Sequence, residues 1–157
     1  MLQVQGAYKT FNAGTANEVR ALESLATRDK TNVEVRVQLA NLLLDSQRYD
    51  EAARWYREVL ALKPGDVDAL ADLGVCLLNA GKLDEALEKL DAALKVNPGH
   101  KSALFNKGLV LRQGGRNREA VAVWDDLLKR YPKDRQIEEM GLREEVERLR
   151  GQPQGGS

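Results

Sequence analysis

The sequence holds few side chains of the kinds that carry out covalent or metal chemistry. It has a single cysteine, Cys76, and a single histidine, His100, and neither has a second Cys or His at ligand spacing. We therefore expect Cys76 to be an inert, half-buried thiol and His100 to have a structural role in a loop. The motifs G-x-S-x-G, H-E-x-x-H, D-x-D-x-D-G and G-x-G-x-x-G are absent from the sequence. Because no nucleophile, base and orienting group can be assembled, we predict that the chain is not an enzyme and uses no metal or cofactor.

A larger group of residues could bind a partner without covalent chemistry. An apolar stripe supplies area for affinity, and the polar groups beside it can bond to a main chain. We expect Asn41 and Asn106 to bind partner backbone, and Phe105 and Leu109 to hold an apolar anchor. The alternative is that neighbouring helices bury part of the stripe. The candidate set, taken from equivalent positions of three helices, is Val37, Asn41, Leu44, Asp45, Ala71, Asp72, Val75, Leu78, Asn79, Phe105, Asn106, Leu109 and Arg112.

These positions are equivalent because the sequence repeats with a period of 34 residues. Pro64, Pro98 and Pro132 mark the period most plainly, and small and bulky residues recur with them in one register. The three repeats comprise residues 33–66, 67–100 and 101–134. The recurring positions hold small residues at Ala40, Gly74 and Gly108 and at Ala52, Ala86 and Ala120, and bulky residues at Tyr56, Leu90 and Trp124.

Each repeat is expected to fold as two antiparallel helices, an A helix followed by a B helix. Apolar residues recur every three or four positions in both halves. Asn32 and Asp66 are good N-caps for A helices, and Gly81 and Gly115 suit a left-handed turn between the helices. Gln47 departs from glycine at the equivalent turn. Each helix pair needs the next repeat to cover its apolar face, so the predicted fold class is an all-α array.

The segments outside the repeats are less regular. Residues 1–14 show no steady period and are predicted to be irregular. Residues 15–32 should form an N-terminal helix, which begins with the capping-box sequence T-A-N-E and is a candidate for a degenerate repeat. Residues 135–150 carry apolar side chains on one side and paired charges on the other, as expected of a C-terminal capping helix. Residues 151–157 are predicted to be a flexible tail.

This pattern resembles the tetratricopeptide repeat family over roughly residues 33–132. The resemblance implies antiparallel helix pairs stacked in a right-handed superhelix, whose A helices line a concave groove that binds a peptide or helix of another protein. It also implies that none of the fold's own residues is catalytic. The chain is similar, more narrowly, to bacterial repeat proteins of cytochrome c assembly and of the cell envelope. That likeness rests on N-L-L-L-D (41–45), L-A-D-L-G-V (70–75), N-P-G-H (97–100), F-N-K-G-L-V (105–110) and A-V-W-D-D-L-L (122–128).

One subclass of the family binds acidic C-termini of chaperones through a carboxylate clamp. The clamp positions, which are Lys, Asn, Asn, Lys and Arg in that subclass, here hold Val37, Asn41, Asp72, Ser102 and Asn106. Only Asn41 matches the pattern, and Asp72 would repel a carboxylate. We therefore do not expect an acidic tail as the ligand.

The overall charge gives little pull towards nucleic acid or anionic membrane, because 24 basic residues balance 24 acidic ones. No apolar run approaches the roughly 20 residues that span a bilayer, and the N-terminus lacks the pattern of a signal peptide. The compartment stays open between the cytoplasm and a soluble domain of a bacterial envelope protein. Lys107 replaces an apolar residue in its register and should extend to solvent or pair with an acid such as Asp72.

An alternative use of the groove involves the chain itself. Leu2, Val4, Tyr8 and Phe11 form an apolar N-terminal segment. This segment could fill the groove in its own chain or in a second copy, which would give a homodimer. The other expectation for such a terminus is disorder.

Overall fold

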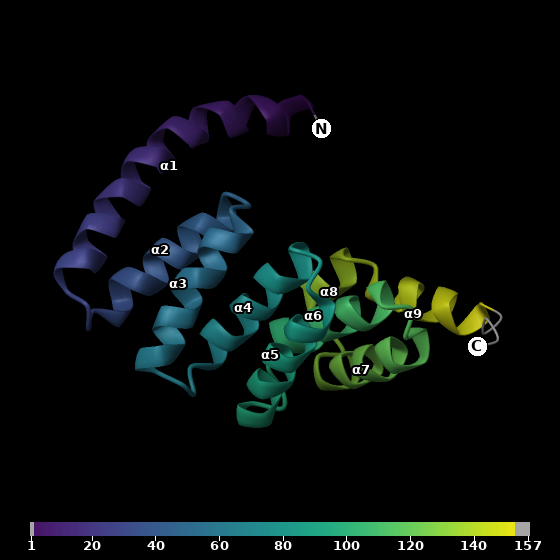
Figure 1. The fold of residues 1–157 in the computed structure, drawn as a ribbon. Coiled ribbons are helices and arrows are strands. Elements are labelled where there is room, and N and C mark those ends of the chain that lie inside the picture. Colours follow the sequence, from purple (N-terminus) through teal and green to yellow (C-terminus); the bar gives the residue numbers. More distant parts are fainter. Residues whose placement is uncertain (1, 153–157) are drawn as a thin grey trace.

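The structure, a computed structural model, describes the backbone of residues 2–152 and the side-chain surroundings of residues 15–152. Within these bounds every regular element is a helix, and the helix pairs form a curved row with α1 at one end and α9 at the other (Figure 1). None of these helices combines the length and apolar character needed to cross a bilayer. The helices are α1 (Leu2–Arg28), α2 (Val33–Asp45), α3 (Tyr49–Leu62), α4 (Val67–Asn79), α5 (Leu83–Val96), α6 (Lys101–Gln113), α7 (Asn117–Arg130), α8 (Arg135–Glu139) and α9 (Leu142–Gly151).

The A helices are α2, α4 and α6, and each begins at a side-chain cap. Asn32 and Asp66 are the N-caps of α2 and α4, as predicted. His100 and Asp134 follow in the same 34-residue register and cap α6 and α8. Each of the four side chains accepts a hydrogen bond from the backbone amide three residues on, at 3.0 to 3.2 Å. His100 therefore has a structural role, as predicted, and that role is to cap the N-terminus of α6.

The turn between the A and B helices keeps one backbone shape in all three repeats. Gly81 and Gly115 have φ of 77°, and Gln47 has φ of 60° at the equivalent position. Glycine adopts this left-handed region freely, whereas a side chain is disfavoured there. The first repeat therefore folds like the others in spite of its unfavourable turn residue.

The two helices of a pair approach most closely at the recurring small residues. A Cβ atom added to Gly74 would lie 2.6 Å from Cγ of Leu90, and one added to Gly108 would lie 2.0 Å from Nε1 of Trp124. Both distances are shorter than a carbon can tolerate, so glycine is sterically required unless the facing side chain moves. This contact sets the spacing between each A helix and its B helix.

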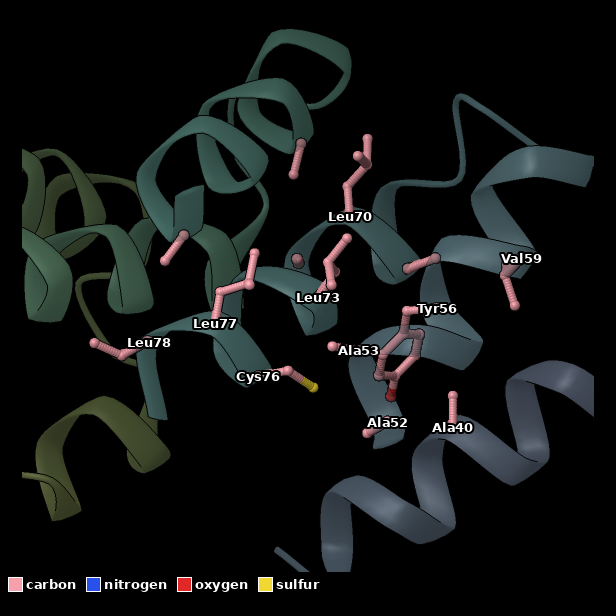
Figure 2. Packing of buried hydrophobic residues seen from close by; sticks show 14 of the residues in the cluster. Ala40, Ala52, Ala53, Tyr56, Val59, Leu70, Leu73, Cys76, Leu77 and Leu78 are labelled. Atoms are coloured by element: carbon pink, nitrogen blue, oxygen red, sulfur yellow. The ribbon is translucent and has the colours of Figure 1, made fainter. Parts of the chain in front are cut away.

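The core runs without interruption from one repeat to the next. Its buried residues form two adjoining clusters, one drawn from α1 to α6 and one from α6 to α9. Figure 2 shows the first cluster, in which the thiol of Cys76 on α4 points towards α3, where Tyr56 and Ala53 lie. Cys76 and Tyr56 are 0% and 1% exposed. Neither the pair α2 and α3 nor the pair α4 and α5 could bury Cys76 and Tyr56 alone, which is why the repeats depend on one another.

The prediction for residues 1–14 was wrong, because α1 begins at Leu2 and continues without a break to Arg28. Thr15 is consequently a buried residue within the helix and not its N-cap. A T-A-N-E sequence caps a helix only where the preceding chain leaves the first amides without partners. Here the preceding turn of α1 is helical and supplies their acceptors. The predicted role of the side chains of Leu2, Val4, Tyr8 and Phe11 lies outside the described residues.

The predicted capping helix, residues 135–150, is two helices instead of one. Gly141 has φ of 66°, which ends α8 after five residues and redirects the chain into α9. Leu142, Val146 and Leu149 of α9 are buried against the second cluster. Glycine adopts this left-handed conformation without steric cost, which allows the helix to break here. Gly151 is still helical, which contradicts a flexible tail beginning at this residue, and residues 153–157 lie outside the description.

Candidate peptide-binding face

The A helices carry the candidate residues on one side, which we call the A-helix face. Residues spaced by three, four or seven positions project from the same side of a helix. The half-buried apolar members of the face are Val37, Leu44, Val75, Phe105 and Leu109. Ala71 and Leu78 are only 0% and 8% exposed, so for these two the alternative of burial by neighbouring helices holds. Three successive A helices therefore leave apolar area open to a ligand, supported from beneath by Ala71 and Leu78.

The amides of this face are already oriented by bonds within the chain. The hydroxyl of Tyr56 donates to Oδ1 of Asn41 at 2.6 Å. Nδ2 of Asn106 donates to the carbonyl oxygen of Ser102 at 2.8 Å and to its Oγ at 3.2 Å. Nδ2 of Asn79 donates to a carbonyl of its own helix at 2.9 Å. With its acceptor engaged, Asn41 presents the donor end of its amide, whereas Asn106 presents its carbonyl oxygen.

Carboxylates from α2 and α4 lie close enough to affect one another. Burial and the nearby charges of Asp68 and Asp45 raise the pKa of Asp72 to about 6, and His100 and the Tyr56 hydroxyl partly oppose this rise. The pKa of Tyr56 is raised in turn, by burial first and then by Asp72. Asp68 meets Nε2 of His100 at 2.9 Å. This part of the A-helix face is therefore acidic.

The opposite end of the face is hollowed beside Phe105. Two cavities adjoin this ring, one of about 320 Å³ bounded by α6, α7 and α9 and one of about 290 Å³ bounded by α6, α7 and α8. Both are also lined by Met140, which is 45% exposed. Arg112 is held at the rim by Glu145, 2.7 Å away, and its guanidinium lies 5.9 Å from the ring centre of Trp124. This end therefore offers cavities that expose apolar surface beside polar side chains, and a paired charge at the rim.

The residues with potential covalent or metal chemistry have structural surroundings. Burial raises the pKa of the Cys76 thiol to about 12, with a further contribution from Asp72, so the thiolate needed for reaction is scarce. Both ring nitrogens of His100 are engaged, Nδ1 by the amide of Ala103 and Nε2 by Asp68. Among the described residues no three His, Cys, Asp or Glu side chains are grouped to hold a metal ion.

Three features of this face were missed from sequence. Met140 lies one 34-residue period after Asn106, so the repeat itself could have placed it here. The hydrogen bond from Tyr56 to Asn41 was also missed. Tyr56 occupies the position that Leu90 and Trp124 hold in the other repeats, and its hydroxyl needs a polar partner on the facing A helix. Lys107 pairs with Asp91 at 2.6 Å and not with Asp72, because Asp91 on α5 lies nearer to its side of α6.

Comparisons with known proteins agree with this architecture. A profile of the tetratricopeptide repeat family matches residues 37–93 and 77–135. A crystal structure of MamA is similar over 90% of this chain and 87% of its own, with 20% identity and a TM-score of 0.75. MamA from Desulfovibrio magneticus RS-1 aligns over 82% and 75% (16% identity, TM-score 0.72), and the tetratricopeptide repeat domain of Arabidopsis OM64 over 77% and 96% (17% identity, TM-score 0.70). A search among curated protein sequences found no significant match.

At these identities the solved structures establish the fold, and the profile establishes the family. They confirm the predicted all-α superhelix of antiparallel helix pairs. Members of the family are in general scaffolds for protein–protein interaction and not enzymes. The chain belongs to the tetratricopeptide repeat family.

Proposed function

We propose that this chain binds a segment of a partner protein on its A-helix face. The observation that carries the proposal is the row of half-buried apolar residues on three successive A helices. Apolar side chains exposed in one row do not stabilise a monomer. A ligand that covers them contributes about 25 cal/mol of binding free energy for each Å² of apolar surface removed from water.

The polar groups of the face suit the main chain of a ligand. Asn41 offers N–H donors and Asn106 offers a carbonyl oxygen, and internal bonds hold both amides in position. Preoriented groups lose little conformational freedom on binding, which favours affinity. Phe105, with a cavity on each side, is the expected contact for a bulky apolar side chain of the partner.

Photocrosslinking in the source cell tests this proposal. A photoreactive amino acid placed at Val75 should capture a defined partner, and the same group at the exposed Glu88 of α5 should not. The double variant Phe105→Ala with Asn106→Ala should abolish capture from Val75 while circular dichroism stays native. Equal capture from both positions, or capture that survives the double variant, would show that the face is not the binding site.

A second candidate function is self-assembly, and the length of α1 favours it. The helix has 27 residues whereas α2, against which it packs, has 13, so its N-terminal half projects beyond the helix pair (Figure 1). Such an arm could lie on the A-helix face of a second copy. Removing residues 1–12 and measuring mass by light scattering separates the two functions. An unchanged mass and melting temperature would rule out assembly through this arm.

A further inference from the structure

We propose that the partner segment is basic, and that Asp72, flanked by Asp45 and Asp68, receives a lysine or arginine side chain from it. This inference rests on the proposed function and adds the charge of the partner. It also gives the segment a direction, with its basic residue over α2 and α4 and its bulky apolar residue over α6 and α8.

In residues 15–152 the carboxylates of Asp45, Asp68 and Asp72 form no ion pair with a lysine or arginine, and only Asp68 has an ion-pair partner, His100. Asp68 and Asp72 are one turn apart on α4, a spacing at which like charges repel. Besides burial, the largest influences on the charge of Asp72 come from Asp68, His100, the hydroxyl of Tyr56 and Asp45. His100 accepts a bond at Nδ1 from the Ala103 amide, and its Nε2 meets Asp68 at 2.9 Å.

The helices that carry these carboxylates cannot neutralise them. Helix α4 contains no lysine or arginine, and α2 contains only Arg36. Arg36 is 4% exposed and is committed elsewhere, to Glu58 at 3.1 Å and to the carbonyl oxygens of Ala26, Asp29 and Asn32. The acidic character of the A-helix face is therefore local, in a chain whose formal net charge is zero.

At α6, in contrast, the neighbouring acids are paired with basic side chains. Asp134 lies 2.6 Å from Lys101, and Glu145 lies 2.7 Å from Arg112. Asp91 lies 2.6 Å from Lys107. All three pairs belong to α6, the A helix beside the cavities. The A-helix face thus has one acidic part and one neutral, apolar part. Charge complementarity calls for a cation over the acidic part.

The surroundings of Asp72 suit a long basic side chain. Asp72 is half-buried, so an ion pair formed there would be screened less than one at the open surface. Val75, three residues on, offers apolar surface beside it for the methylene stem of lysine or arginine. The N-terminal arm of this chain is a poorer match, because residues 1–14 supply one basic side chain, Lys9, against the three carboxylates of Asp45, Asp68 and Asp72. A separate basic protein segment fits better than a second copy.

A displayed library of random peptides, selected on the full-length chain, tests the inference. Enriched peptides should carry lysine or arginine together with a bulky apolar residue. Binding of a selected peptide, followed by fluorescence anisotropy, should weaken about tenfold or more in Asp72→Asn and should fall as salt is raised. Asp84→Asn, which removes an exposed carboxylate at the start of α5, is the matched control and should bind like the wild type.

Each other outcome overturns a distinct claim. Peptides without a basic bias, whose binding is still lost in Phe105→Ala with Asn106→Ala, would refute the charge inference and leave the proposed function standing. Peptides that bind this double variant as well as the wild type would refute the proposed function itself. A selection that enriches no peptide would count against both. Circular dichroism of each variant establishes that a loss of binding is not a loss of folding.

Discussion

Nε1 of Trp124 donates a 3.0 Å hydrogen bond to the carbonyl oxygen of Phe105. The indole lies directly over Gly108, where no Cβ atom could fit. The two aromatic rings are also in contact, with centroids 6.4 Å apart. A core residue of the B helix therefore fixes the position of the aromatic side chain that we expect a partner to contact, and stability and binding are linked at this point.

Replacing Gly108 by alanine should destabilise the chain by about 2 kcal/mol. The added methyl group would collide with a rigid, buried indole, and overpacking of this kind costs roughly 1–3 kcal/mol, partly offset by the better helix propensity of alanine. The midpoint of urea unfolding measures the effect. Gly65→Ala is the control, because nothing lies within 4 Å of its Cβ position. Equal midpoints for the two variants would contradict the steric account.

Replacing Gln47 by glycine should stabilise the chain by about 0.5–1 kcal/mol. The side chain is exposed and holds the backbone at φ of 60°, a conformation that glycine adopts without the steric cost. The opposite change at the equivalent turn, Gly81→Ala, should destabilise by a similar amount. Thermal or urea unfolding of both variants checks the prediction, which fails if the two substitutions shift stability in the same direction.

Asp72→Asn should stabilise the chain above pH 6. The carboxyl group has a folded pKa of about 6 against an ordinary value of 3.8. The unfolded chain therefore loses this proton first as the pH rises, and stability falls between pH 3.8 and about 6. At pH 8 the asparagine variant should be more stable by about 1–2 kcal/mol, a figure reduced for partial solvent screening. The difference should nearly vanish below pH 3.8.

Urea unfolding of Asp72→Asn and of the wild type at several pH values measures this difference. Asp84→Asn should not reproduce the gain. If the variant is less stable than the wild type at pH 8, the ionised Asp72 carboxylate stabilises the fold. That result would contradict the prediction that its ionisation destabilises the chain.

His100→Ala should lower stability by about 1 kcal/mol, the usual worth of a helix N-cap. For a chain of this length that corresponds to a fall in Tm of roughly 2–4 °C. His100→Asn should recover most of the loss, because Asn32 fills the same position in the first repeat. Calorimetry of the two variants decides the matter. If asparagine does not restore stability, the stabilising role of His100 lies in its contact with Asp68 and not in the helix cap.

The helices of the three repeats could be predicted because each repeat imposes the same steric constraint. The small residues at Ala40, Gly74 and Gly108 each face a bulky residue of the following helix, and that pairing occurs three times at one spacing. The ends of the chain have no such redundancy. At Thr15 a local capping signal competed with a continuous helix, and at Gly141 no local pattern distinguishes a glycine that breaks a helix from one that a helix tolerates.

The A-helix face was predictable in register but not in detail. Helical spacing placed Val75 and Phe105 at accessible positions, yet it could not tell that Leu78 is buried, because that depends on how the next helix crosses. The bond from Tyr56 to Asn41 joins positions on different helices and depends on their packing distance. Long side chains such as Lys107 can reach several acids, so sequence alone did not identify Asp91.

The buried thiol of Cys76 has a practical consequence. It lies in the seam between the first and second repeats, and as the only cysteine of the chain it is the only possible site of thiol labelling. A reagent can reach it only when α4 parts from α3, so the rate of labelling reports how often the array opens at that seam. The labelling rate of Cys76 therefore measures the separation of two neighbouring repeats, and a ligand that spans them should lower this rate.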